Sequence, residues 1–444
     1  MGKLFGTDGI RGIVGEDLTH ELAMKIGEAA AYVLGNKEDL VVLIGRDTRI
    51  SGQMLASALS AGFMSQGAKV IDLGVVPTPA VSYLVKKYNA SMGAMISASH
   101  NPSEYNGIKL FDGEGFKLPD ALENEIEKYL LGKAVPTTNI VGTYDVCETA
   151  IDDYIDHIVE SANIINTNLK VVVDCANGSA SATAPLLFNE LGIDATFINF
   201  EYDGYNINDK AGSTHLEGLI QKVKEEKADI GIAYDGDADR CLMIDENGQE
   251  VDGDQIMAIS ALALKNNDKL TNNTLVGTVM SNLGLVKFCE ANDINFVATK
   301  VGDRYVLEKM LECDYIIGGE QSGHVIFKDF ANTGDGELTS IQVLGMLTDA
   351  NVKMSELASV MKKYPQVLIN VKVKEEAKGQ YENDSKVTKV INEVEKELNG
   401  EGRVLIRPSG TEALIRVMIE GLDQEDINNK ANKIADVIKK KFGA

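Results

Sequence analysis

The amino-acid sequence predicts an α/β fold made of three similar α/β blocks followed by a smaller α+β domain. Short apolar, strand-like runs alternate with amphipathic helical stretches up to about residue 364, a pattern that is typical of α/β proteins. Glycine is frequent, with 42 residues, and it gathers in short loops after the strand-like runs, where α/β proteins carry much of their function. A chain of 444 residues is long enough for about three domains of roughly 150 residues each.

The first block comprises residues 1–150. Apolar side chains recur at helical spacing over 17–34 and again over 51–66, so both segments are predicted to be helices. Three short apolar runs are predicted to be buried strands: 40–44, 69–73 and 92–96. Polar loops follow the first and the last of these strands.

The second block, 151–252, and the third, 253–364, repeat this alternation. Predicted strands lie at 169–174, 229–234, 274–279, 295–299 and 314–317. The stretch 90–97 resembles 228–235 in its pattern, and 313–319 follows it loosely. In each case a short buried strand ends in a polar loop, and binding sites of α/β proteins form at the carboxyl ends of strands. Chance similarity between buried strands is the alternative to three related blocks.

The residues from 365 to 444 have a different pattern. Strands are predicted at 365–375, 403–407 and 414–419, and amphipathic helices at 384–398 and 423–442. This segment is therefore predicted to be a separate small α+β domain. No low-complexity linker precedes it, so we expect the blocks to pack tightly.

Composition excludes several classes of function. The formal net charge is −24, and such a surface repels nucleic acid and anionic lipid at long range. No apolar run approaches the roughly 18 residues of a membrane span, and the N-terminus lacks the apolar stretch of a signal peptide. Five cysteines include no Cys-x-x-Cys pair, which is typical of a reducing compartment. We expect a cytoplasmic protein that binds neither membranes nor nucleic acid.

Three carboxylates stand at alternate positions directly after the predicted strand 229–234. They are Asp235, Asp237 and Asp239, in the stretch Asp-Gly-Asp-Ala-Asp-Arg. A tight loop can turn all three toward one centre, and hard oxygen ligands with open coordination positions suit Mg²⁺. Crowded carboxylates without a cation repel one another. The spacing therefore favours a metal site over an acidic surface turn, although it lacks the Gly and Glu positions of an EF-hand.

Two hydroxyls and an imidazole follow the strand 92–96, in the residues 97–102, Ser-Ala-Ser-His-Asn-Pro. No Gly-x-Ser-x-Gly elbow surrounds them, which disfavours acyl transfer. Beside a divalent-cation loop, a serine is better interpreted as a phosphoryl carrier or a metal-proximal phosphoserine. Taken alone, the stretch is more simply a capped turn.

Two further loops could hold an anionic sugar. The residues 407–412, Arg-Pro-Ser-Gly-Thr-Glu, can wrap a phosphate with backbone N–H groups and hydroxyls while Arg neutralises it, and Arg416 lies just beyond. An ordinary hairpin turn is the alternative. The loop 318–324 offers a carboxylate, an amide, a hydroxyl and an imidazole, which suit a polyol. Neither a P-loop nor a Gly-x-Gly-x-x-Gly fingerprint is present, which argues against an ATP kinase or a nicotinamide enzyme.

Together these loops resemble the motifs of the α-D-phosphohexomutase superfamily, and most closely those of its bacterial phosphoglucosamine mutase branch. The motifs occur along the whole chain in the order that the family has. The resemblance implies three related α/β domains with mixed sheets and a smaller C-terminal α+β domain around a central cleft. The expected domains and their loops are 1–150 (phosphoserine), 151–252 (metal), 253–364 (sugar-binding) and 365–444 (phosphate-binding).

The resemblance also implies a role for each motif residue. Ser99 corresponds to the phosphorylated serine, with His100 beside it, and Lys109 to a lysine that assists proton transfer. Arg11 corresponds to an arginine near the reacting phosphate. The implied Mg²⁺ ligands are phosphorylated Ser99, Asp235, Asp237 and Asp239. The implied substrate-binding residues are Glu320, Ser322, His324, Arg407, Ser409, Gly410, Thr411 and Arg416.

Gln321 is the residue that bears most on the substrate. A Glu-Gln-Ser-Gly-His loop resembles the glucosamine branch, whereas phosphomannomutase/phosphoglucomutase relatives tend to have Met at this position. The stretches 212–215 and 302–305 also resemble the glucosamine branch. One departure is Ala238, which stands where many members have Gly. Because alanine tolerates fewer backbone angles than glycine, we do not expect a positive φ at this position.

The implied activity is that of an isomerase which interconverts glucosamine 6-phosphate and glucosamine 1-phosphate for UDP-N-acetylglucosamine and cell-wall precursor synthesis. It implies a phosphoserine enzyme, one Mg²⁺ per chain and a sugar 1,6-bisphosphate as the priming intermediate, and it is compatible with a homodimer. Two alternatives stay open: a phosphomannomutase/phosphoglucomutase of the same superfamily, and a non-catalytic phosphosugar-binding protein. The second is disfavoured because binding alone needs no serine at the metal.

Overall fold

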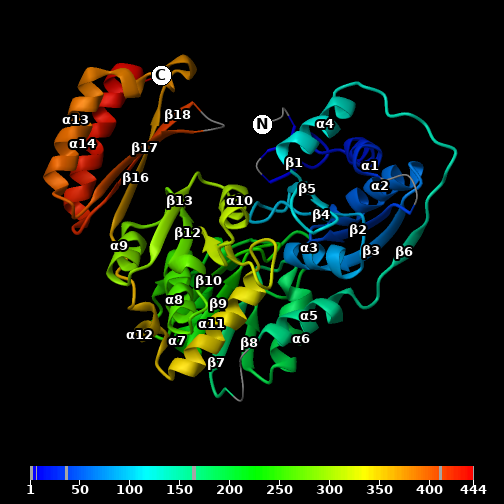
Figure 1. Ribbon diagram of the computed structural model, residues 1–444, viewed down its shortest axis with the longest axis horizontal. Helices are drawn as coiled ribbons and strands as arrows, with labels where there is room; N and C mark the ends of the chain where they lie inside the picture. Colours follow the sequence, from blue (N-terminus) through cyan, green and yellow to red (C-terminus); the bar gives the residue numbers. More distant parts are fainter. Residues whose placement is uncertain (1–3, 7, 36–38, 163–166, 410–412, 444) are drawn as a thin grey trace. The chain divides into compact units, whose positions relative to one another are not determined.

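The computed structural model describes residues 4–6, 8–35, 39–162, 167–409 and 413–443. Within these residues the chain forms four sheets, three of them mixed and the last one antiparallel (Figure 1). Two compact units contain them: Met1–Met280 with Asn292–Val360, and Ser281–Ala291 with Met361–Ala444. This architecture confirms the expectation of three related α/β domains with mixed sheets and a smaller C-terminal domain.

The first sheet has the strand order β1-β5-β4-β2-β3-β6. Its strands are β1 (Ile10–Ile13), β2 (Val41–Arg46), β3 (Lys69–Val75), β4 (Met92–Ile96), β5 (Tyr105–Asp112) and β6 (Tyr144–Val146). Its helices are α1 (His20–Leu34), α2 (Gly52–Ser65), α3 (Thr78–Lys87) and α4 (Asp120–Leu130). Helix α1 begins later than predicted because the Thr19 side chain accepts a hydrogen bond from the Leu22 N–H and caps the helix.

The second sheet has the order β11-β10-β9-β7-β8. Its strands are β7 (Lys170–Asp174), β8 (Asp194–Ile198), β9 (Ile230–Tyr234), β10 (Cys241–Asp245) and β11 (Glu250–Val251). The helical segments of this part are α5 (Ala150–Ser161), α6 (Ala180–Glu190), η1 (Gly212–Thr214) and α7 (Glu217–Glu226). Every residue of β9 is buried, as its unbroken apolar sequence predicts for a strand that is covered on both faces.

The third sheet has the order β13-β12-β14-β15. Its strands are β12 (Thr274–Thr278), β13 (Asn295–Thr299), β14 (Ile317–Gly319) and β15 (Val325–Phe327). The helical segments around it are α8 (Gly253–Asn266), η2 (Thr271–Asn273), α10 (Asp303–Cys313), α11 (Gly336–Ala350) and α12 (Met354–Ala358). The prediction of a strand over 314–317 was largely wrong, because Asp314 ends α10 in a left-handed conformation and β14 starts only at Ile317.

All three mixed sheets place a loop at the same point of their topology. In each sheet a parallel strand turns back into an antiparallel neighbour: β4 into β5, β9 into β10, and β14 into β15. The connections are the polar loops that the sequence singled out. The weak internal repeat therefore reflects one shared topology.

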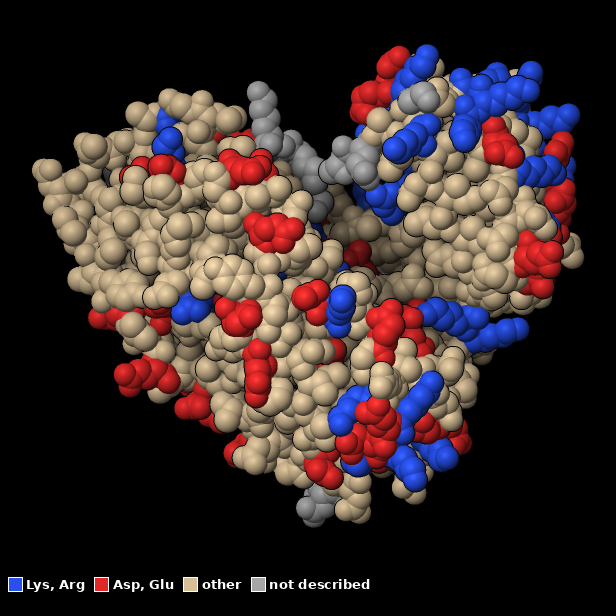
Figure 2. All heavy atoms as spheres, turned by 180° about the vertical axis from the view of Figure 1, so that it is seen from behind, with Lys and Arg blue, Asp and Glu red and all other residues tan. Residues whose placement is uncertain are grey.

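The C-terminal unit is a three-stranded antiparallel sheet of order β16-β18-β17 that packs against two long helices. Its elements are α9 (Leu283–Ala291), β16 (Gln366–Lys372), η3 (Glu375–Ala377), η4 (Tyr381–Asn383), α13 (Ser385–Leu398), β17 (Arg403–Pro408), β18 (Leu414–Glu420) and α14 (Gln424–Phe442). Figure 2 shows many Lys and Arg side chains on one face of this unit, in a chain whose formal net charge is −24. Among the helices that the structure describes, none is both long and apolar enough to cross a bilayer.

Candidate active site

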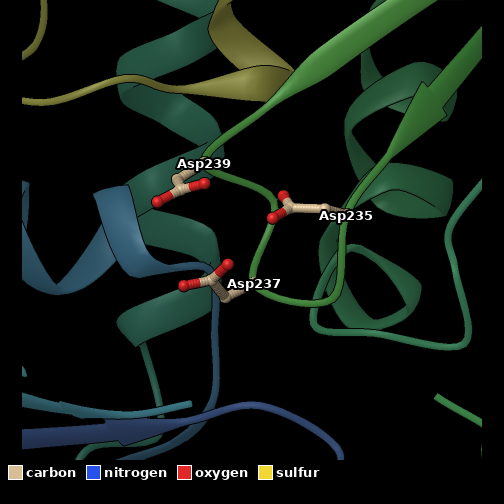
Figure 3. A group of neighbouring side chains, drawn as sticks. All are labelled: Asp235, Asp237 and Asp239. Atoms are coloured by element: carbon tan, nitrogen blue, oxygen red, sulfur yellow. The ribbon is translucent and has the colours of Figure 1, made fainter. Parts of the chain in front are cut away.

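The loop between β9 and β10 brings three carboxylates together. Asp235, Asp237 and Asp239 each offer an oxygen, and these three oxygens lie within 4.8 Å of one another (Figure 3). All three residues are buried. The loop starts as a tight turn, in which the Ala238 N–H donates to the Asp235 carbonyl over 3.0 Å. The alternate spacing in the sequence therefore produces the convergence that it predicts.

Ala238 has a positive φ of 53°, so the expectation that it would avoid this region was wrong. Left-handed backbone costs a residue with a Cβ roughly 1–2 kcal/mol, which the surroundings must offset. The N–H and the carbonyl of Ala238 are both engaged, the carbonyl accepting from the Gly336 N–H at the start of α11 over 2.9 Å. These two bonds fix the peptide groups on both sides of Ala238.

The carboxylates are crowded in a way that a cation would relieve. Burial, followed by the charges of Asp239 and Asp237, raises the pKa of Asp235 well above its ordinary value. Although burial opposes it, Lys109 holds the pKa of Asp239 well below its ordinary value. One buried oxygen each of Asp237 and Asp239 has no hydrogen-bond partner among the described residues. Oxygen donors of this kind fit a hard divalent cation.

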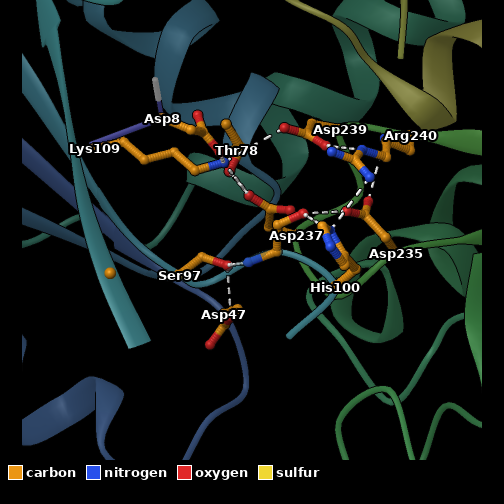
Figure 4. A network of polar contacts seen from close by, with 12 residues as sticks. Asp8, Asp47, Thr78, Ser97, His100, Lys109, Asp235, Asp237, Asp239 and Arg240 are labelled. Carbon is orange, nitrogen blue, oxygen red and sulfur yellow. Dashed lines mark hydrogen bonds and ion pairs between the residues drawn. The ribbon is translucent and has the colours of Figure 1, made fainter. Parts of the chain in front are cut away.

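Ser99 lies beside this cluster. Its Oγ donates to Asp235 Oδ2 over 2.6 Å and lies 3.3 Å from His100 Nδ1. The same His100 nitrogen lies 3.3 Å from an Arg240 guanidinium nitrogen (Figure 4). Burial, together with the charge of Arg240, lowers the pKa of His100 to about 4. The structure therefore joins the serine loop to the acidic loop, two motifs that are far apart in the sequence.

Lys109 reaches the same cluster from β5, which lies between β1 and β4. Its Nζ lies 2.7 Å from an oxygen of Asp237, 3.1 Å from one of Asp8 and 3.4 Å from one of Asp239. Although burial opposes it, these carboxylates raise the pKa of Lys109 well above its ordinary value. Arg11, on β1, forms an ion pair with the same Asp8. Both predicted basic residues thus meet at one carboxylate.

The loop 320–324 joins the cluster through one of its three predicted residues. His324 Nδ1 lies 3.7 Å from an oxygen of Asp239, and His324 Nε2 accepts from the Gly334 N–H over 3.0 Å. Glu320 accepts from the Gly302 N–H over 3.0 Å. Ser322 is exposed. His324 is therefore close to the acidic loop, whereas Glu320 is tied to the loop that precedes α10.

Sequence reasoning missed several charged and polar residues of the site. Asp8 bridges Lys109 and Lys117, and Lys117 also pairs with Asp303. Thr78, the first residue of α3, donates its N–H to the Asp237 carbonyl over 2.9 Å. The available signals were the glycine-rich stretch around Asp8 and the prolines on both sides of Thr78, which are typical of a helix start.

The C-terminal unit holds the predicted phosphate-binding residues that the structure describes. Arg407 on β17 lies directly opposite Arg416 on β18, and Ser409, two residues after Arg407, is buried. Burial and the charge of Arg416 lower the pKa of Arg407, whose Nε has no hydrogen-bond partner among the described residues. Two adjacent guanidinium groups can bind an anion. Gly410 and Thr411 lie outside the described residues.

Comparison with known families covers nearly the whole chain. Four models of phosphoglucomutase/phosphomannomutase match it: alpha/beta/alpha domain I over residues 2–134, domain II over 152–248, domain III over 252–364, and the C-terminal domain over 368–437.

The chain is also similar over its full length to curated proteins. A phosphoglucosamine mutase from Alkaliphilus oremlandii is 53% identical over 448 residues, and one from Acetivibrio thermocellus is 52% identical over 449 residues, with 100% of each chain covered in both cases.

Solved structures share the fold. A phosphoglucomutase/phosphomannomutase family protein from Burkholderia thailandensis has a TM-score of 0.82 at 24% identity, covering 98% of this chain and 97% of that one. An N-acetylphosphoglucosamine mutase from Aspergillus fumigatus, solved with GlcNAc-6P and magnesium, has a TM-score of 0.67 at 16% identity, covering 98% and 95%. From the matching models and the full-length relatives it follows that the chain belongs to the phosphoglucomutase/phosphomannomutase family.

Proposed function

We propose that the chain interconverts glucosamine 6-phosphate and glucosamine 1-phosphate, with phosphorylated Ser99 as the phosphoryl carrier. Membership of the family makes it a phosphohexomutase, an isomerase that moves a phosphoryl group within a sugar phosphate. The observation that carries the proposal is the Ser99 hydroxyl, 2.6 Å from Asp235 in a cluster of buried carboxylates. The names of the full-length relatives support glucosamine phosphate as the substrate.

Asp235, Asp237, Asp239 and phosphorylated Ser99 would hold Mg²⁺ in this proposal. The oxygens of Asp237 and Asp239 that have no hydrogen bond among the described residues, and the raised pKa of Asp235, support a cation here, and a neighbour of the same fold was solved with magnesium. When bound, the ion would neutralise charge on the transferring phosphoryl group. We propose one Mg²⁺ per chain.

The side chains around Ser99 have distinct proposed tasks. Lys109 and Arg11 place positive charge next to the reacting phosphoryl group, where it reduces the repulsion between anions. His100 Nδ1, 3.3 Å from Ser99 Oγ, lies within relay distance of a proton that moves to or from this oxygen. Phosphoryl transfer from Ser99 to the free hydroxyl of the sugar phosphate gives a 1,6-bisphosphate, and return of the other phosphate to Ser99 completes the isomerisation.

The remaining motif residues are proposed to bind the sugar and its second phosphate. Glu320, Ser322 and His324 would contact the sugar, and Gln321 is the proposed marker of the glucosamine branch. The proposed phosphate-binding residues of the C-terminal domain are Arg407, Ser409, Gly410, Thr411 and Arg416. We also propose that the domains end at 150, 252 and 364, and that the protein acts in the cytoplasm, which its five free cysteines support.

A substrate panel tests the proposal. Turnover of glucosamine 6-phosphate, glucose 6-phosphate and mannose 6-phosphate is measured with Mg²⁺, each assay being primed with the corresponding sugar 1,6-bisphosphate. We expect kcat/KM to be highest for the amino sugar. A preference for glucose or mannose phosphate would overturn the substrate assignment, and no turnover of any of the three would overturn the catalytic role.

A further inference from the structure

The backbone of Ser99 adopts a conformation that serine does not favour. Its φ is 52°, in the left-handed region. A Cβ clashes with the backbone in this region, so residues other than glycine occupy it only where their surroundings hold them. Ser99 is also almost fully buried, with 1% of its surface exposed. The groups that bind its own peptide atoms therefore determine where its hydroxyl points.

The Ser99 carbonyl accepts two side-chain hydrogen bonds. Arg49 Nη2 and Asn208 Nδ2 each donate to it over 2.9 Å. The same two nitrogens also donate to the Asn101 carbonyl, over 2.7 and 3.0 Å respectively. Two side chains therefore hold the same pair of carbonyls in the serine loop.

Arg49 holds this loop at both ends. Its guanidinium is buried, with Nε bonded to Asp47 over 2.9 Å and Nη1 to the carbonyls of Pro102 and Tyr105. Asp47 accepts in turn from Ser97 Oγ over 2.6 Å, and that oxygen accepts from the Ser99 N–H over 2.9 Å (Figure 4). Both polar backbone atoms of Ser99 are thus fixed by one connected network.

Asn208 contributes from the second domain. It has a positive φ of 60°, and its N–H donates to the Ala176 carbonyl over 2.8 Å, so the side chain projects from a fixed backbone. Gly236 of the acidic loop also packs closely against the Ser99 carbonyl, because a Cβ at this position would lie 2.5 Å from its oxygen. The Ser99 carbonyl is therefore enclosed by residues of both domains whose loops must meet.

We propose that Arg49 and Asn208 are positioning residues for phosphoryl transfer. Their hydrogen bonds to the Ser99 carbonyl hold the left-handed backbone, and this backbone aims Ser99 Oγ at Asp235. The inference rests on the proposed function in one respect, because the direction of the Ser99 hydroxyl can affect turnover only if Ser99 is the phosphoryl carrier. Neither side chain contacts the substrate in this proposal, so both act on kcat through Ser99.

Replacement of Asn208 by Gly tests the hydrogen bonds of this side chain to the serine loop separately from any effect on general stability. Glycine adopts positive φ without strain, so Asn208→Gly removes only the side-chain bonds. Asn199→Gly is the matched control, since Asn199 also has a positive φ, of 49°, and its side-chain nitrogen also donates a hydrogen bond, but to Asp174 and not to the serine loop. We expect kcat of Asn208→Gly to fall roughly 10- to 100-fold with KM changed less than about twofold. The control is expected to keep its kcat.

Two further variants distinguish the loss of hydrogen-bond donation from the loss of side-chain volume. Asn208→Asp has the same size but cannot donate to a carbonyl, so its kcat is expected to fall at least as far as that of Asn208→Gly. Arg49→Lys keeps the charge but cannot reach four carbonyls and Asp47, so it is expected to lose kcat as well. Wild-type kcat in Asn208→Asp would overturn the proposal.

A crystal structure of Asn208→Gly provides a readout that does not depend on the substrate. We expect Ser99 to leave the left-handed region, or its Oγ to move away from Asp235. An unchanged Ser99 conformation together with an unchanged kcat would overturn the proposed positioning role of Asn208. Absence of wild-type turnover on every phosphohexose would overturn the proposed function instead. The geometry of Ser99 in the variant would then be the only test of whether Asn208 positions Ser99.

Discussion

At the scale of the residue, Ser99 and Ala238 share a left-handed backbone, and both belong to the loops that form the candidate site. Each costs roughly 1–2 kcal/mol relative to an ordinary conformation. Strain of this kind persists where neighbouring contacts over-determine the geometry, and it is concentrated at functional sites. In this chain the contacts are hydrogen bonds to the peptide groups of both residues.

Replacement of Ser99 by Ala is expected to abolish turnover. The variant lacks the oxygen that would carry the phosphoryl group, and it loses only the two contacts of this hydroxyl, with Asp235 and with His100. Phosphohexose turnover and intact-mass spectrometry after treatment with sugar bisphosphate measure the effect, and neither activity nor phosphate uptake is expected. Ser103→Ala, in the same loop, is the control that should retain both. Wild-type activity of Ser99→Ala would remove Ser99 from its role.

Replacement of Arg416 by Ala is expected to raise KM for the phosphosugar. A charge-assisted hydrogen bond contributes about 1.5–3 kcal/mol, equivalent to roughly a 10- to 150-fold rise in KM. Lys372→Ala is the control, because Lys372 is exposed on β16 of the same sheet and pairs with Leu414 rather than with an arginine. Steady-state kinetics check both variants. Equal KM values in the two would mean that the phosphate binds elsewhere.

The sequence predicted the residues of the site where chemistry and spacing act locally. Three aspartates at alternate positions converge because one short loop carries them. Asp8 and Asn208 could not be found in this way, since their importance comes from contacts with residues more than 100 positions away. The positive φ of Ala238 escaped prediction for the same reason, because the N-terminus of α11 holds it.

At the scale of the element, short strands could be predicted most closely. The strand 92–96 has the predicted bounds because an unbroken apolar run defines it, and 295–299 also has the predicted bounds, although it begins with a polar residue and none of its residues is buried. Helix ends were less accurate. Helix α1 begins at His20, after its cap Thr19 and three residues after the predicted start, and α10 ends at Cys313, so that residues 314–316, which are predicted to be strand, connect it to β14. Both errors arise because caps depend on hydrogen bonds rather than on apolar spacing.

Helix α11 begins at an aspartate that makes folding sensitive to pH. The Asp335 side chain caps the helix by accepting from the Leu338 N–H over 2.9 Å, and it also accepts from the Tyr154 hydroxyl. Burial raises its pKa to about 7. Between its usual pKa near 4 and this value, the folded protein holds a proton that the unfolded chain has lost. The free energy of unfolding that Asp335 contributes therefore falls as pH rises through this range.

The Asp335→Asn variant tests this dependence. Asparagine keeps the capping oxygen but does not titrate. We expect the difference in unfolding free energy, wild type minus variant, to fall by up to about 1.4 kcal/mol per pH unit between pH 5 and 7, and to level off above that. Urea unfolding of both chains at pH 5, 6, 7 and 8 measures it. Parallel curves for the two chains would contradict the assignment.

At the scale of the molecule, one repeated topology assembles the site of the larger unit. Each of its three sheets turns from a parallel strand into an antiparallel one, and the three connecting loops meet around Asp235 and Asp239. Ser99 of the first loop contacts Asp235, and His324 of the third lies near Asp239. The sequence predicted the three blocks from their alternation. The meeting of their loops follows from packing between domains, which no local pattern encodes.

We expect the crowded carboxylates to couple the stability of the larger unit to a divalent cation. We expect Mg²⁺ to raise the thermal midpoint of the wild type by about 2–5 °C at a concentration roughly 100 times its Kd, because a ligand that binds only the folded state stabilises it by about 2.7 kcal/mol there.

Asp235→Asn removes one of the proposed ligands, so its midpoint should move much less. Asp174→Asn is the matched control, since Asp174 is a buried aspartate of the same sheet that lies outside the cluster, and it should respond as the wild type does. Thermal scans with Mg²⁺ and with NaCl at equal ionic strength separate binding from screening. A shift of equal size in all three chains would show that the cation does not bind at the aspartate cluster.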